Sequence, residues 1–101
     1  MTQDPQALCQ SAGDHYKSGN KAKAAELFSK AVAQGHAVAQ CNLGGMHRDG
    51  EGVPQNYKKA AELYSQAAAQ GCADAQCNLG FMYRNGDGVP QDKERGVSLW
   101  Q

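Results

Sequence analysis

The chain has four cysteines and three histidines, the side chains most able to hold a metal ion or act as nucleophiles. No C-x₂-C or H-x₃-H pair is present. The spacing of Cys41, His47, Cys72 and Cys77 matches no compact four-ligand zinc site. The sequence therefore predicts no metal site and no bound cofactor.

Pairing of cysteines is a second chemistry to consider. Cys41 and Cys77 hold equivalent positions in two repeated segments, and packed helices lie ~8–10 Å apart. Their Cα atoms are therefore expected beyond the ~7 Å limit for a disulfide. We expect free thiols that serve as small apolar side chains. A Cys41–Cys72 or a Cys72–Cys77 disulfide is the alternative.

Two glycine-rich loops could suggest calcium binding. In one of them Asn85, Asp87 and Glu94 fall at positions 3, 5 and 12 of an EF-hand frame. Position 1 is Tyr83, which cannot ligate a hard cation as a carboxylate does, and the twin loop has Lys58 at position 12. We therefore assign the glycines to turn geometry and predict no calcium site.

No catalytic constellation is visible in the sequence. It lacks a G-x-S-x-G elbow, a phosphate-binding loop and an H-E-x-x-H motif. His15, His36 and His47 are not paired with an acid or a nucleophile by the pattern of the sequence. We predict that the chain is not an enzyme and that it has no catalytic residues.

Length and charge limit the function classes. The 101 residues are enough for one small domain, and ten basic residues balance ten acidic ones. Binding to nucleic acid or to an anionic membrane needs a basic excess, so neither is predicted. No stretch approaches the ~18 apolar residues of a membrane span. The start at Met1–Gln6 shows no secretory signal, so we expect a cytoplasmic location.

An internal repeat organises the whole chain. Residues 23–55 and 59–91 are identical at about 24 of 33 positions after a shift of 36 residues. Apolar residues within each copy have helical spacing, as in Ala60, Leu63, Tyr64 and Ala67. The hydrophobic fraction of 41% is carried largely by alanine, which favours thin helices that pack closely.

The pattern predicts helices over residues 6–18, 21–34, 38–48, 56–70, 74–84 and 92–101. Gly35 and Gly71 are expected to take left-handed conformations just past helix ends. Asn56 and Asp92 are expected as N-caps. One amphipathic helix pair cannot bury its own apolar face, so neighbouring pairs must stack. We predict an all-α, right-handed α-α superhelix, a solenoid of about three stacked helix pairs, with the last pair truncated.

These residues resemble the Sel-one-like repeat (SLR) family, relatives of the tetratricopeptide solenoids. The family pattern A-x-A-Q-x-x-L-G, followed by Y-x-x-G-x-G-V-P, is present from Ala73 to Pro90. The resemblance implies a single repeat domain over 1–101, with units at about 5–36, 37–72 and 73–101. The first unit is more tetratricopeptide-like, because its turn is about four residues shorter and lacks the G-x-G-V-P loop.

The last unit lacks residues that correspond to the second half of the second helix in the other units. Val97, Leu99 and Trp100 are expected to cover the open end of the stack. Either the chain is a piece of a longer repeat protein, or this end drives self-association through Leu99 and Trp100.

The resemblance also implies a binding face. In tetratricopeptide-like solenoids the first helix of each pair lines a concave groove. This frame places six candidate partner-binding residues on that face: Tyr16, Asn42, Arg48, Asn78, Phe81 and Arg84. The arginines could hold carboxylates of a peptide, the asparagines its backbone, and Phe81 an aromatic anchor. In the alternative, the asparagines bond a neighbouring helix end and the arginines pair with Asp49, Glu51 or Glu62.

We therefore expect a scaffold or adaptor protein that presents a concave groove to a peptide or protein partner. Some cysteine-rich secreted relatives are associated with binding or hydrolysing β-lactams, so such an activity is the alternative function. That alternative predicts oxidised cysteines and a nucleophile that can be acylated.

Overall fold

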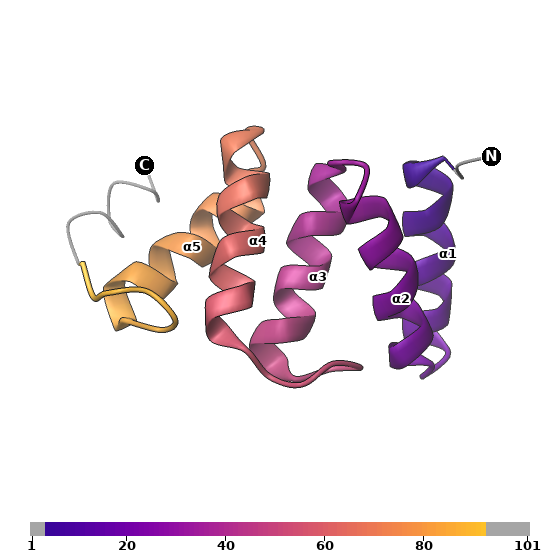
Figure 1. The fold of residues 1–101 in the computed structure, drawn as a ribbon, viewed down its shortest axis with the longest axis horizontal. Coiled ribbons are helices and arrows are strands. Elements are labelled where there is room, and N and C mark those ends of the chain that lie inside the picture. The colour runs from indigo at the N-terminus through magenta and orange to yellow at the C-terminus, as the bar shows by residue number, and fades with distance from the viewer. Residues whose placement is uncertain (1–3, 93–101) are drawn as a thin grey trace.

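The computed structural model describes residues 4–92, and every regular element in this part is an α-helix. The five helices are α1 (Pro5–Lys17), α2 (Lys21–Val32), α3 (Ala37–Asp49), α4 (Tyr57–Ala69) and α5 (Ala73–Asn85). They follow one another in chain order along the long axis of the molecule, from α1 at one end to α5 at the other (Figure 1). The molecule measures 42 × 24 × 19 Å. The predicted α-solenoid of helix pairs is confirmed.

The first five predicted helices agree with the observed ones to within two residues at each end. The local signals act as expected: Asn56 caps α4 by accepting a hydrogen bond from the Lys59 backbone N–H at 3.0 Å. Gly35 and Gly71 have φ angles of +75° and +89°. The sixth predicted helix lies outside the described residues, apart from Asp92, and so do Val97, Leu99 and Trp100.

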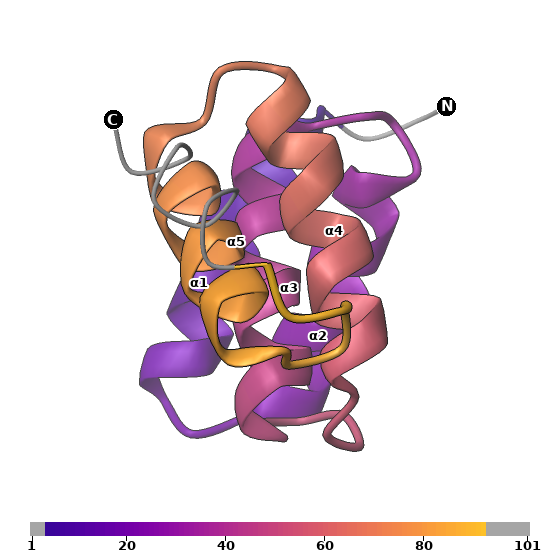
Figure 2. The same ribbon diagram turned by 90° about the vertical axis from the view of Figure 1, so that its left-hand side faces the viewer.

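The helices form two layers. Seen along the stack, α1 and α5 lie toward one side, and α2 and α4 toward the other (Figure 2). Alanine makes the close packing possible, because a side chain of one methyl group lets helix backbones approach each other. Seven alanines in the described part have no exposed surface: Ala12, Ala24, Ala31, Ala39, Ala60, Ala67 and Ala75.

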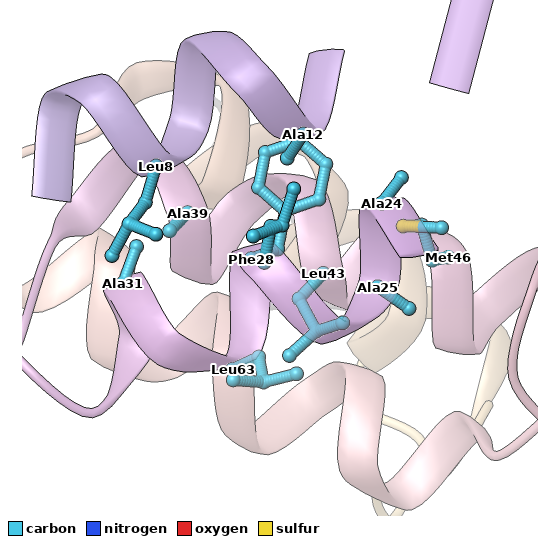
Figure 3. Packing of buried hydrophobic residues seen from close by; sticks show 11 residues of the cluster. Leu8, Ala12, Ala24, Ala25, Phe28, Ala31, Ala39, Leu43, Met46 and Leu63 are labelled. Atoms are coloured by element: carbon cyan, nitrogen blue, oxygen red, sulfur yellow. The ribbon is translucent and has the colours of Figure 1, made fainter. Parts of the chain in front are cut away.

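Two clusters of buried side chains form the core. The first joins α1, α2 and α3 and includes Leu63 of α4, and the Phe28 ring lies against Ala12 within it (Figure 3). The second joins α4 and α5. At its centre is Tyr64, which is 1% exposed. A Cβ on Gly44 would lie 3.0 Å from the Tyr64 ring, so glycine at this point of α3 makes room for the aromatic side chain.

The loops after α3 and α5 fix how one unit sits on the previous one. Gly52 has a φ angle of +73°, and a Cβ there would overlap the backbone carbonyl of Lys21 at the start of α2. Gly88, one repeat later, has the same relation to Tyr57 at the start of α4. Each loop tip thus packs its backbone directly on the second helix of the preceding unit, which only glycine allows.

Alanine substitutions at three glycines separate the effects of conformation and contact. Gly52→Ala is expected to lower the free energy of unfolding by about 2 kcal/mol or more, because strain from a left-handed φ adds to a backbone collision. Gly19 has a φ of +90° and open space around it, so Gly19→Ala should lower the free energy of unfolding by only about 1 kcal/mol. Gly13 lies inside α1 with no neighbour within 4 Å, so Gly13→Ala should raise the free energy of unfolding by about 0.5–1 kcal/mol.

Urea unfolding followed by circular dichroism measures all three variants. Equal losses for Gly52→Ala and Gly19→Ala would show that the contact with Lys21 contributes nothing to stability.

Candidate partner-binding face

Three hollows lie along the face formed by the first helix of each pair, α1, α3 and α5. Their volumes are about 560, 200 and 330 Å³. The first two lie between α1 and α3, and the third lies between α3 and α5. Asn42 lines all three, and its side chain makes no hydrogen bond within residues 4–92. An exposed amide at the centre of this face is therefore able to donate and accept hydrogen bonds.

Arg48 and Asn78 meet across the third hollow. The Nη1 atom of Arg48 donates to the Asn78 side-chain oxygen at 3.4 Å, linking α3 to α5. The Asp49 carboxylate accepts from the same guanidinium at 3.0 and 3.3 Å. The hydrogen bond that Arg48 donates to Asp49 is the main cause that raises the pKa of Arg48. Arg48 and Asn78 are thus engaged within the chain: Arg48 pairs with Asp49, and Asn78 accepts from the Arg48 side chain and not from a helix end.

The exposed Phe81 and the partly buried Arg84 form one group at the far end of the face. Phe81 is 41% exposed, the largest aromatic exposure on α5. The guanidinium carbon of Arg84 lies 5.2 Å from the centre of the Phe81 ring, within the range of a cation–π interaction. Neither residue lines any of the three hollows described above. Their stacking keeps a flat aromatic surface and a positive charge next to each other.

Tyr16 lines the second hollow and takes part in a clasp between the first two units. Its hydroxyl lies 2.9 Å from each oxygen of the Glu51 carboxylate. Lys21 Nζ donates to the same carboxylate at 2.6 Å. Hydrogen bonds from Lys21 and Tyr16 lower the pKa of Glu51, while the bond to Glu51 raises the pKa of Tyr16. Glu51 therefore pairs with Lys21 and not with an arginine.

His47 is placed at the back of this face, at the position that Tyr83 holds in the next unit. Its Nδ1 atom is buried and has no hydrogen-bond partner among the described residues. Burial lowers the pKa of His47, and a hydrogen bond with the Pro54 backbone opposes that shift. Burial therefore favours the neutral form of the ring.

The short first unit hides one equivalence between repeated positions. After a shift of 32 residues in the first unit, Cys9 aligns with Cys41, and a further shift of 36 reaches Cys77. The first shift is shorter because the first unit lacks the long loop. All four cysteines are free thiols in the structure, and residues 4–92 contain no cluster of three or more potential metal ligands. None of the described helices is long and apolar enough to cross a bilayer.

Comparison with known proteins identifies the repeat. The family model described as Sel1 repeat matches residues 7–36, 37–72 and 73–101. The chain belongs to the Sel1 repeat family. Proteins built of Sel1 repeats generally act as scaffolds for protein interactions and are typically not enzymes. No curated protein matches the chain.

Two crystal structures of Sel1-type proteins are similar to this one. The first is c5321, a protective antigen present in uropathogenic Escherichia coli strains, with an SLR fold; it is 33% identical with a TM-score of 0.91 over 95% of this chain. The second is a Sel1 repeat protein from Oxalobacter formigenes, 34% identical with a TM-score of 0.76 over 78% of this chain. The matched region is 21% and 23% of those chains, so this Sel1 repeat chain spans under a quarter of each.

The partly buried His47 is expected to make the free energy of unfolding fall in mild acid. Its pKa in the folded chain is below that of the unfolded chain, so its contribution is present above pH ~6.5 and is lost as the pH falls below that value. His47→Tyr, which copies the third unit, removes this titration. The free energy of unfolding at about pH 7.5 and about pH 5.5 should differ less in the variant than in the native chain. An unchanged difference would contradict this assignment.

Proposed function

We propose that this chain is a non-enzymatic scaffold that holds a peptide segment of a partner protein against the face formed by α1, α3 and α5. The observation that carries the proposal is the row of three hollows along this face, with the exposed Asn42 amide common to all of them. A continuous row of hollows suits an extended chain better than a compact small molecule, because no single hollow encloses a ligand.

The six candidate residues have different roles in this proposal. Asn42 bonds the backbone of the peptide, and the Phe81–Arg84 group serves as an aromatic and cationic anchor at one end. Tyr16, Arg48 and Asn78 shape the face through their bonds to Glu51 and to each other. The β-lactam alternative predicts oxidised cysteines, and no observation among residues 4–92 favours it.

Peptides selected from a random displayed library on the immobilised chain supply the probe for a binding test. We expect Asn42→Ala and the double variant Phe81→Ala/Arg84→Ala each to raise the Kd of the selected peptides roughly tenfold, as the loss of an anchoring contact does. Isothermal titration calorimetry measures the Kd. Circular dichroism checks that each variant remains folded.

The matched control changes the opposite layer. Lys58 and Gln66 are exposed residues of α4, so Lys58→Ala/Gln66→Ala should leave the Kd within about twofold of the native value. Peptides that lose affinity only in the α4 variant would place the binding surface on the other layer and overturn the proposal.

A further inference from the structure

Equivalent positions at the two junctions between units hold different residues. At the first junction Cys9 of α1 meets His36, the N-cap of α3, with 3.8 Å between Sγ and Nδ1. The equivalent positions at the second junction are Cys41 of α3 and Cys72, the N-cap of α5. The repeat thus places two cysteines where the first junction has a cysteine and a histidine in contact.

Cys72 is near enough to Cys41 to contribute to the raised pKa of the Cys41 thiol. Both side chains are partly buried and pack against the second core cluster. His36 also accepts a bond from the Ala39 backbone N–H at 3.4 Å, whereas the Cys72 side chain makes no capping bond. No helix N–H therefore competes with Cys41 for the sulfur of Cys72.

From the equivalence with the Cys9–His36 contact, and from the packing of both cysteines against one core cluster, we propose that Cys41 and Cys72 form a thiol–disulfide site. A low-molecular-weight disulfide of the glutathione class oxidises the pair and links α3 covalently to the start of α5. The site differs from a disulfide within one helix pair, because it joins the first helices of two successive units.

The reaction balances as two thiol–disulfide exchanges. The Cys72 thiolate attacks one sulfur of RS–SR, forms a mixed disulfide and releases RS⁻, which takes up a proton. Cys41 then loses its proton, attacks the Cys72 sulfur and releases the second RS⁻, which is protonated in turn. Two protein thiols are oxidised and one RS–SR is reduced to two RSH. Burial and the neighbouring Cys72 raise the pKa of Cys41 to about 11. Cys41 is therefore the thiol that reacts in the second step.

The Cys41–Cys72 disulfide would lie next to the proposed binding face. Cys41 lines the third hollow together with Asp74, which is two residues after Cys72. The exposed Cys77 lines the same hollow. Cys77 is therefore the competing thiol that an experiment must distinguish from Cys72.

The test equilibrates the reduced full chain with oxidised glutathione, blocks the remaining thiols and maps tryptic peptides by mass spectrometry. We expect a cross-link between the peptide of residues 31–48, with Cys41, and the peptide of residues 60–84, with Cys72 and Cys77. Its yield should fall roughly tenfold or more in Cys72→Ser and remain at the native level in Cys77→Ser. Circular dichroism confirms that both variants are folded.

A gain-of-function variant tests the geometry without relying on a loss. His36→Cys in a Cys41→Ser background gives the first junction the residues of the second. It should produce a cross-link between the peptides of residues 1–17 and 31–48 under the same conditions. Four free thiols in the oxidised native chain, or a 31–48 to 60–84 cross-link that persists in Cys72→Ser, would overturn the proposal.

Discussion

The approach of one backbone to another at the loop tips is the constraint on which the stack depends. Gly52 and Gly88 each lie so close to the first residue of a preceding helix that a Cβ would not fit. The same hydrogen bond closes both loops. The side chains of Gln55 and Gln91 donate to the backbone carbonyls seven residues earlier, each at 2.9 Å. The loop is therefore a rigid spacer, and it sets how far apart successive units stand.

The spacing set by the loops determines what the exposed face can present. Successive first helices lie close enough for Arg48 to reach Asn78, yet far enough apart to leave hollows between them. The Glu51 clasp with Tyr16 and Lys21 fixes the first junction in a similar way. Tyr16, Arg48 and Asn78 form the frame of the face through their hydrogen bonds. The Asn42 amide and the Phe81 ring are exposed on it.

Much of the fold could be predicted because it follows from local rules repeated at a fixed period. The apolar spacing of Leu63 and Tyr64 predicts a buried helix face, and Asn56 marks a helix start, both as observed. The side-chain partners could not be predicted in the same way. Glu51 and Lys21 are thirty residues apart and meet only because the loop tip folds back on α2. The register of Cys9 was missed because the shorter first turn changes the repeat shift.

Two adjacent residues of helix α4 belong to different core clusters. Leu63 belongs to the cluster shared with the first three helices, and Tyr64 to the cluster shared with α5. A small rotation of α4 about its own axis would move these two side chains in concert, so a load on one core reaches the other through this helix. We therefore expect the two core clusters to move together through a rotation of α4, and not independently of each other.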